Sequence, residues 1–301
     1  MGRSKKSQAK KREKQKKVTE LKKKKLKEKK TDRGGASKEN TRVQTEPAKT
    51  RPSTGVSKYT VEQLLQKAEE YIDTLDYELA LKFCQRALEV DENRVQALET
   101  AGTVYIELGD AESALKYFNR AVTLSPNNGF SKYMYLGQLN EGKQAIECFQ
   151  KGVELMLKDR EDGKEALEGA CANPEETTTV SDRDISRAYC SMAEIYLTDS
   201  CFEEDAEQHC KDCLDKAIEA DTDNAEAHQL LASYLLSINN PEDAKTAIEK
   251  SLSLWLPQWR EHLEKSEVSE AFELCPLSYE VRISTAKILI ELQLFLEAIE
   301  V

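Results

Sequence analysis

Cysteine and histidine are the residue types here that most readily do metal or nucleophilic chemistry, and one short run brings them together. His209-Cys210-Lys211-Asp212-Cys213 contains a CxxC pair. A structural zinc site needs four ligands, usually from two such pairs, and no second CxxC follows. His228 and His262 match no ligand spacing. We therefore predict no metal site, and we expect Cys213, like Cys84, to pack as a small core residue.

Other catalytic signatures are missing from the sequence. It has no Walker-type phosphate loop and no GxGxxG motif, and nothing supports a Cys/His catalytic pair. Paired carboxylates are frequent only because 55 of the 301 residues are Asp or Glu. We predict a protein without enzyme activity and without a cofactor.

The charged residues are divided unevenly along the chain. Residues 1–58 contain 22 basic and 6 acidic residues, whereas residues 59–301 contain 22 basic and 49 acidic residues. A basic arm and an acidic body indicate two different classes of partner. No apolar run approaches the roughly 20 residues of a membrane helix, and no apolar signal segment follows the basic N-terminus. Eight cysteines without an export signal are typical of reduced thiols in the cytosol or nucleus.

The basic arm is expected to have no stable fold. Residues 1–33 hold 17 Lys or Arg and few large apolar side chains, so burial cannot offset chain entropy. Residues 34–58 have linker composition. The dense basic blocks indicate a nuclear or nucleolar address that an import receptor reads. Specific RNA recognition is not expected, because residues 1–58 contain no aromatic side chain to stack on bases.

The acidic body contains a repeat of 34 residues. Leu64, Ala68, Tyr71, Ala80 and Ala87 align with Leu98, Gly102, Tyr105, Ala114 and Ala121. Small residues at the eighth, twentieth and twenty-seventh positions are typical of tetratricopeptide repeats, because they let two helices approach closely. Gly109-Asp110 is expected to form the turn between the helices of the second repeat.

Further units follow with less regular spacing, around Leu136-Gly137, Ala193, Ala232 and Ala286. We predict an all-α tetratricopeptide-repeat α-solenoid of about five to six helix pairs, with a disordered basic N-terminal arm. Its parts are the arm and linker (1–58), repeats one to three (59–158), an acidic insertion (159–184) and repeats four to six (185–301). The last repeat is incomplete at Val301, which we interpret as a truncated or spliced form.

For two groups of apolar side chains near the end of the chain, the sequence predicts how far each is buried. Trp255 and Trp259 are expected to pack an irregular segment, 252–276, against the solenoid, with an aromatic anchor for a partner as the alternative. If the sixth repeat lacks a complete second helix, the apolar face of its first helix should be partly uncovered. That face comprises Ile283, Ile288, Leu289 and Leu292.

Carboxylates recur where the first helices of such repeats line a groove, at helix positions 2, 5, 9, 12 and 13. Only Arg187 and Lys287 oppose them there. Repeated charge of one sign weakens a fold, and a basic partner would relieve the repulsion, although an ordinary solvated helix face remains an alternative. The candidate partner-binding residues are Glu62, Glu69, Asp73, Glu99, Glu107, Glu194, Glu226, Glu280 and Glu291.

A rival function can be tested at the same positions. Repeat proteins that bind the C-terminal carboxylates of heat-shock chaperones place Lys and Asn at groove positions 5 and 9 of one repeat and Asn at position 6 of the next. This chain has Leu65, Glu69 and Thr100 there. A peptide carboxylate would meet negative charge, which argues against a co-chaperone of that kind.

Two segments resemble one eukaryotic family more closely than generic repeats. They are KYMYLGQLNEGKQAIECFQKGVELM (132–156), with a shortened first helix, and CPLSYEVRISTAKILIELQLFLEAIEV (275–301). Together with the basic arm and the acidic insertion, they resemble the assembly chaperones dedicated to large-subunit ribosomal protein four. The resemblance implies an α-solenoid that captures a newly made basic ribosomal protein and accompanies it to the nucleolar pre-ribosome.

These observations favour a non-catalytic assembly chaperone for a basic ribosomal protein, found in the nucleus, nucleolus and cytoplasm. The alternative from another class is a general scaffold or co-chaperone adaptor. An RNA-binding protein that acts through its arm is a weaker alternative.

Overall fold

The computed structural model describes residues 59–169, 180–265 and 277–301, so the arm (1–58) lies outside the described residues. Within those ranges, every regular element is a helix. The elements are α2 (Val61–Asp73), α3 (Tyr77–Val90), α4 (Val95–Glu107), α5 (Ala111–Leu124), α6 (Ser131–Leu139), α7 (Gly142–Gly169), α8 (Asp182–Leu197), α9 (Ala206–Ala220), α10 (Ala225–Ser237), α11 (Pro241–Lys265), α13 (Tyr279–Glu291) and α14 (Phe295–Glu300).

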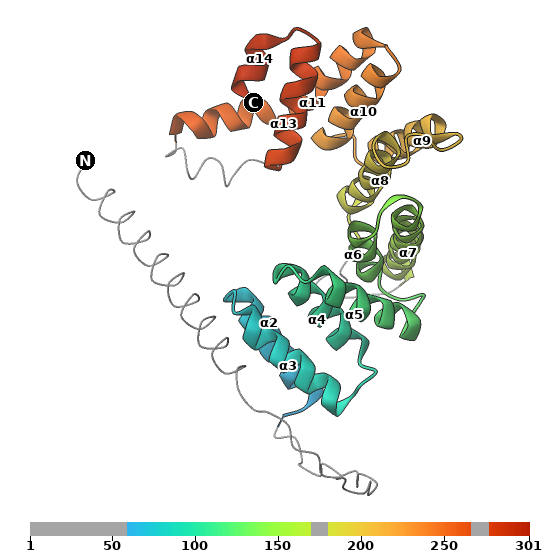
Figure 1. The fold of residues 1–301 in the computed structure, drawn as a ribbon, viewed down its shortest axis with the longest axis vertical. Coiled ribbons are helices and arrows are strands. Elements are labelled where there is room, and N and C mark those ends of the chain that lie inside the picture. The colour runs from blue at the N-terminus through green and yellow to red at the C-terminus, as the bar shows by residue number, and fades with distance from the viewer. Residues whose placement is uncertain (1–58, 170–179, 266–276) are drawn as a thin grey trace, which may run out of the picture. The chain divides into compact units, whose positions relative to one another are not determined.

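Consecutive helices pack as pairs: α2 with α3, α4 with α5, α6 with α7, α8 with α9, α10 with α11, and α13 with α14 (Figure 1). Each pair also contacts the next, through α3 and α4, α5 and α6, α7 and α8, α8 and α10, and finally α10 and α13. This arrangement confirms the predicted all-α solenoid of helix pairs. α6 has 9 residues where α2 and α4 have 13, so the predicted shortening of the third repeat is also confirmed.

The turn between the two helices of a repeat has a recurring geometry. Gly109 adopts a φ of 75°, as the sequence predicted, and Leu75, Asn239 and Gln293 adopt φ values near 60° at the same place in their repeats. Asp110 then caps α5, because its carboxylate accepts a hydrogen bond of 3.1 Å from the Ser113 amide. The chain therefore reverses within three residues and packs the second helix back on the first.

Small residues on the first helices control the size of the side chain opposite them. A Cβ atom added at Gly102 would lie 2.7 Å from Cζ of Phe118, and one at Gly137 would lie 2.7 Å from the ring of Phe149. In the first repeat, Ala68 packs in one buried cluster with the smaller Cys84. A large residue on the second helix thus requires glycine on the first.

Gly102→Ala should consequently lower the free energy of unfolding by about 1–2 kcal/mol, because overpacking outweighs the gain of about 1 kcal/mol in helix propensity. In a Phe118→Cys background, the same change should become neutral or stabilising, since the obstructing ring is gone. Gly163→Ala is the matched control, because an added Cβ there meets nothing within 4 Å. Urea unfolding followed by circular dichroism measures all variants; equal effects at Gly102 and Gly163 would contradict this packing account.

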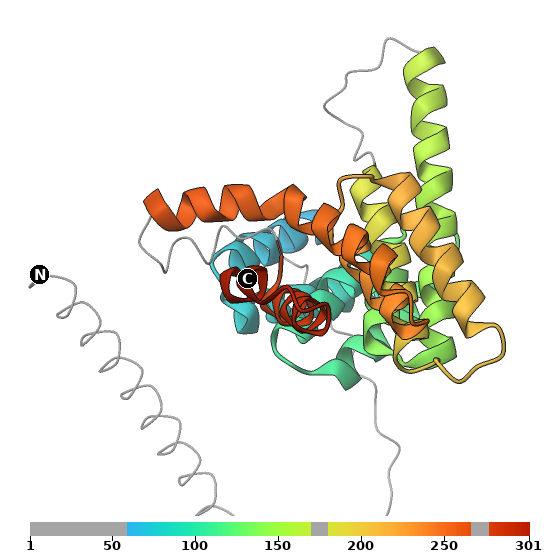
Figure 2. The same ribbon diagram turned by 90° about the horizontal axis from the view of Figure 1, so that it is seen from above.

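Two second helices extend further than the others. α7 has 28 residues and α11 has 25, against 14 in α3 and α5, and both extensions are visible in Figure 2. The predicted insertion 159–184 therefore begins as helix up to Gly169 and ends inside α8, while 170–179 lies outside the described residues. The irregular segment predicted from residue 252 was wrong up to Lys265, because Pro257 is accommodated within α11.

The tryptophans of α11 are core residues. Trp255 and Trp259 are buried, with relative exposures of 1% and 2%, and they pack with Ile248 and Leu289. Packing against the solenoid is thus confirmed, and the alternative of an exposed anchor is wrong for this structure. The helix wraps its apolar side chains inward despite the missing amide proton of Pro257, because burial of two indoles outweighs one lost hydrogen bond.

The end of the chain differs from the expectation. Ile288 and Leu289 are buried, so the predicted uncovering of the α13 face is wrong for these two residues, whereas Ile283 is exposed and Leu292 is half-buried. Ile288 and Leu289 pack in one cluster with residues of α10 and α11, such as Ala232 and Trp255. The exposed apolar side chains lie instead mainly on α14, where Leu296 and Ile299 have relative exposures of 78% and 82%.

Candidate protein-binding groove

The nine predicted carboxylates all lie on first helices. They are Glu62, Glu69 and Asp73 on α2, Glu99 and Glu107 on α4, Glu194 on α8, Glu226 on α10, and Glu280 and Glu291 on α13. We call the surface formed by α2, α4, α6, α8, α10 and α13 the first-helix surface. Seven of the nine side chains are exposed, and only Glu99 and Glu226 are half-buried. The structure therefore divides the nine carboxylates into seven that a partner can reach freely and two that are partly covered by the fold.

Glu99 is held by a buried lysine that the sequence analysis missed. Lys132 of α6 has a relative exposure of 0%, and its Nζ lies 3.3 Å from Oε1 of Glu99. Nζ also donates to the carbonyl oxygens of Asn128 and Gly129. This pair joins the second repeat to the third. Glu99 is thus a structural residue, and its role as a free partner-binding carboxylate is not supported.

Two further carboxylates have partners within the fold. Oε1 of Glu62 lies 3.3 Å from Nη2 of Arg94, and both side chains are largely exposed. Hydrogen bonds from its own backbone and from Thr60, together with Arg94, lower the pKa of Glu62. Glu107 accepts a hydrogen bond from Tyr77, whose pKa is raised mainly by burial and then by this carboxylate. Both carboxylates keep an exposed face for a partner.

Glu194 and Glu226 come from neighbouring helices and act on each other. Burial raises the pKa of Glu226, the negative charge of Glu194 raises it further, and the guanidinium of Arg187 opposes the rise. Two like charges beside one arginine leave this part of the first-helix surface with net negative charge. A lysine or arginine from a partner would relieve the repulsion between them.

Seven of the nine carboxylates, all except Glu62 and Glu99, have no ion pair in the part of the chain that the structure describes. Besides Glu194, four of these seven are exposed and form no side-chain hydrogen bond there. They are Glu69, Asp73, Glu280 and Glu291. Glu291 lines a cavity of about 350 Å³ between α10 and α13 together with Lys287, which the sequence analysis had noted as one of two opposing cations. These four side chains, with Glu194, are the most available for a basic partner.

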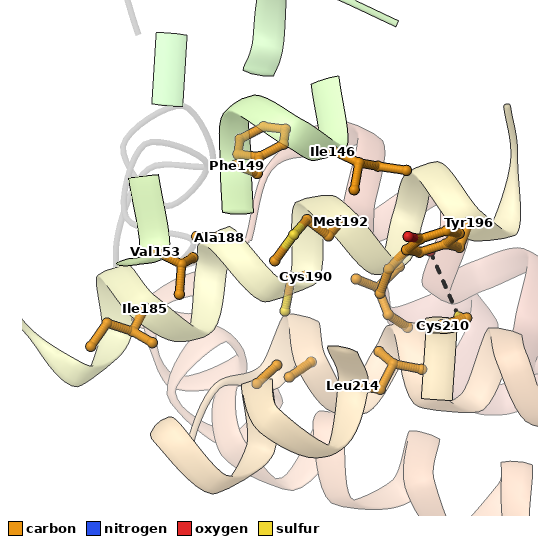
Figure 3. Close-up of a cluster of buried hydrophobic side chains, with 14 of the residues drawn as sticks. Ile146, Phe149, Val153, Ile185, Ala188, Cys190, Met192, Tyr196, Cys210 and Leu214 are labelled. Carbon is orange, nitrogen blue, oxygen red and sulfur yellow. Dashed lines mark hydrogen bonds between the residues drawn. The ribbon is translucent and has the colours of Figure 1, made fainter. Parts of the chain in front are cut away.

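Cys84 and Cys213 pack in the core as predicted. Cys84 is buried, and Cys213 is half-buried against the cluster drawn in Figure 3. The dashed line in Figure 3 joins Sγ of Cys210 to the carbonyl oxygen of Ala193, at 3.7 Å. Burial raises the pKa of Cys84 and Cys210 to about 12 and that of Cys213 to about 11, so these thiols are protonated at neutral pH. Across the described ranges, no group of three or more metal-ligating side chains gathers.

Comparison with known proteins identifies the same helix-pair repeats that the structure shows. The sequence model of the tetratricopeptide repeat family matches residues 95–128 and 225–254, which comprise α4 with α5 and α10 with part of α11. The chain is a tetratricopeptide-repeat solenoid. No described helix is long and apolar enough to cross a membrane.

The repeats are similar to those of a particular group of chaperones. A protein of Schizosaccharomyces pombe named "Probable assembly chaperone of rpl4" is 32% identical over 176 residues, which are 58% of this chain and 46% of that protein. A protein of the same name from Emericella nidulans is 28% identical over 255 residues, or 79% of this chain and 58% of that one. This chain therefore spans about half the length of the curated relatives it matches.

Solved structures show the same relationship. The tetratricopeptide-repeat chain is similar to a structure titled "Assembly Chaperone of RpL4 (Acl4) (Residues 1-338)", with a TM-score of 0.70, 25% identity, and coverage of 80% of this chain and 88% of that one. MamA reaches a TM-score of 0.50 at 17% identity, with coverage of 69% of this chain and 96% of that one, which shows the repeat fold alone. The resemblance to the ribosomal-protein chaperones, drawn from segments 132–156 and 275–301, is confirmed.

Proposed function

We propose that this protein is a non-catalytic assembly chaperone, and that its client is the basic large-subunit ribosomal protein four. The observation that carries the proposal is the similarity of its repeats, in sequence and in fold, to proteins named as assembly chaperones of Rpl4. The chain spans only part of those curated relatives, so client and activity are inferences for this protein.

The charge of the molecule supports a basic client. Residues 59–301 carry a net charge of −27, and seven of the nine candidate carboxylates form no ion pair among the described residues. A basic protein would be attracted to this surface at long range and would relieve its self-repulsion when bound. Such binding keeps a basic client soluble and needs no catalytic group.

The rival co-chaperone function fits the structure less well. Leu65, at the position where a peptide carboxylate would be bound by lysine, is buried with a relative exposure of 2%. Glu69 is exposed beside it and is negatively charged. A C-terminal carboxylate would find no donor at the first of these positions and repulsion at the second.

The test is a binding measurement with purified Rpl4 and, as a control, an acidic-tailed heat-shock chaperone. We expect a one-to-one complex with Rpl4 on size-exclusion chromatography, which weakens as salt screens the charges. We expect no complex with the heat-shock chaperone. If Rpl4 does not bind, or if the heat-shock chaperone binds in its place, the proposal is wrong.

We also propose that residues 1–33 act as a nuclear or nucleolar address, bound by an import receptor. The support is their 17 Lys or Arg residues. Removing residues 1–33 should abolish nuclear accumulation of a fluorescently tagged chain while binding of Rpl4 by the body is unchanged. Equal nuclear signal from the shortened and complete chains would refute this address.

A further inference from the structure

The first-helix surface contains a cavity that none of the nine carboxylates lines. It lies between α6 and α8, has a volume of about 470 Å³, and has the second helix α7 as its floor. Met134 of α6, Phe149 and Met156 of α7 and Ala188 of α8 supply apolar lining. Figure 3 shows Phe149 and Ala188 on these facing helices. Polar lining comes from Ser131, Gln138, Asp184, Arg187 and Ser191. Cavities of this size hold a bulky side chain or a small ligand.

One wall of the cavity is formed by the short α6, which supplies Met134 and Gln138. With 9 residues instead of 13, this helix is about one turn shorter than α2 and α4. Phe149 and Met156 are otherwise well packed, with relative exposures of 3% and 2%, so the floor is rigid and preformed. Met134 is half-buried at the wall, and its flexible thioether can adjust to an occupant.

The charges around the cavity indicate what kind of chain would occupy it. Asp184 at the rim is engaged in capping α8 through Ser181, and Arg187 at the rim is offset by Glu226. Glu194 follows Arg187 by seven residues, or two turns, and therefore extends the same face of α8. Beyond the cavity along this face of α8, the pair Glu194 and Glu226 favours a positively charged side chain.

We propose that this cavity anchors an extended segment of the basic client by one bulky aliphatic or aromatic side chain, next to a lysine or arginine that binds Glu194 and Glu226. The proposal rests on the proposed function and adds an apolar anchor to the electrostatic attraction. Charge attracts the client from a distance, and the buried side chain selects one segment of it.

The test fills the cavity without changing charge. Gln138 is exposed at the rim on α6, and Gln138→Trp places an indole over the opening. Gln85→Trp is the matched control, because Gln85 is also exposed and lines a cavity of about 590 Å³ between α3 and α5, on the second helices. Both variants are made in the full chain and titrated with purified Rpl4 at low and at moderate salt.

We expect Gln138→Trp to raise the Kd about tenfold or more, as loss of one buried bulky side chain would. The ratio of the Kd of this variant to the Kd of the parent protein should not change when the salt concentration is raised, because salt does not screen the burial of apolar surface. Gln85→Trp should bind like the parent. Ser191→Phe, which fills the cavity from α8, gives the same comparison if Gln138→Trp does not fold.

The outcomes separate this inference from the proposed function. If the parent does not bind Rpl4, the proposed function fails. If the parent binds and the cavity-filling variants bind as tightly, or if Gln85→Trp loses as much affinity, only the anchor is overturned. A photo-crosslinking residue at position 138 gives an independent readout. It should attach to a client segment in which a bulky apolar residue adjoins Lys or Arg, and attachment to an acidic or wholly polar segment would overturn the proposal.

Discussion

Reversing four exposed carboxylates of the first-helix surface should raise the Kd for Rpl4 about a hundredfold while leaving the fold intact. The variant is Glu69→Lys, Asp73→Lys, Glu107→Lys and Glu194→Lys, all at exposed positions. Single exposed pairs contribute about 0.2–1 kcal/mol each, and reversal replaces each attraction by repulsion, so four changes together cost about 3 kcal/mol. Titration at low salt, with circular dichroism of each variant, measures the effect.

Glu99 is left out of this variant for a structural reason. Lysine at that position would face the buried Lys132, and loss of binding could then reflect unfolding. Glu194→Lys has the opposite effect on stability, because it removes the like charge beside Glu226. The design therefore changes the charge of the surface without breaking an ion pair of the fold.

A matched control separates the surface from the net charge of the molecule. Glu89, Glu154, Glu219 and Glu249 are exposed carboxylates on second helices, and changing them to Lys alters the net charge by the same amount. This control should raise the Kd less than tenfold. If both variants lose the same affinity for Rpl4, only the overall charge matters. If the first-helix variant has an unchanged Kd, the client binds elsewhere.

The second large effect concerns stability. Glu99→Gln should lower the free energy of unfolding by about 3 kcal/mol, because it leaves the buried ammonium of Lys132 without its counter-charge. The remaining carbonyl oxygens of Asn128 and Gly129 solvate Lys132 only in part. Combining Glu99→Gln with Lys132→Met should restore most of the loss, since an apolar side chain then fills the buried site. Urea unfolding followed by circular dichroism measures these differences.

Glu62→Gln is the control for this measurement. Its pair with Arg94 has the same N–O distance, 3.3 Å, but the two side chains have relative exposures of 66% and 38%. Exposed pairs contribute little, so this change should cost less than about 1 kcal/mol. If both glutamate variants are destabilised equally, the burial of Lys132 has no energetic consequence and the interpretation of Glu99 as a structural residue is wrong.

Together these predictions describe a surface with two kinds of carboxylate. Some, such as Glu69 and Asp73, are free of ion pairs within the described ranges and are available for binding. Others, such as Glu99, join neighbouring repeats. A partner that bound only carboxylates of the first kind would leave those of the second kind, and the contacts between repeats that depend on them, undisturbed.

The amino-acid sequence alone was sufficient to predict the fold class, the repeat period, the short third repeat and the placement of all nine carboxylates on first helices. These features depend on residues that are close along the chain. Ala68 and Ala80, or Gly102 and Ala114, are 12 residues apart, and a helix, a turn and a second helix bring them together in every repeat. The spacing of small and apolar residues along the chain is therefore enough to predict these features.

Only the tertiary structure decided which carboxylates are available and where an apolar anchor could bind. Lys132 and Glu99 are 33 residues apart and belong to different repeats, and neither residue alone signals that they meet. The same is true of Ile288 and Leu289, which pack with residues of α10 and α11 although their own repeat looked too short to bury them. The burial of a side chain depends on what packs over it from elsewhere in the chain, and the residue's own type and helical position do not contain that information.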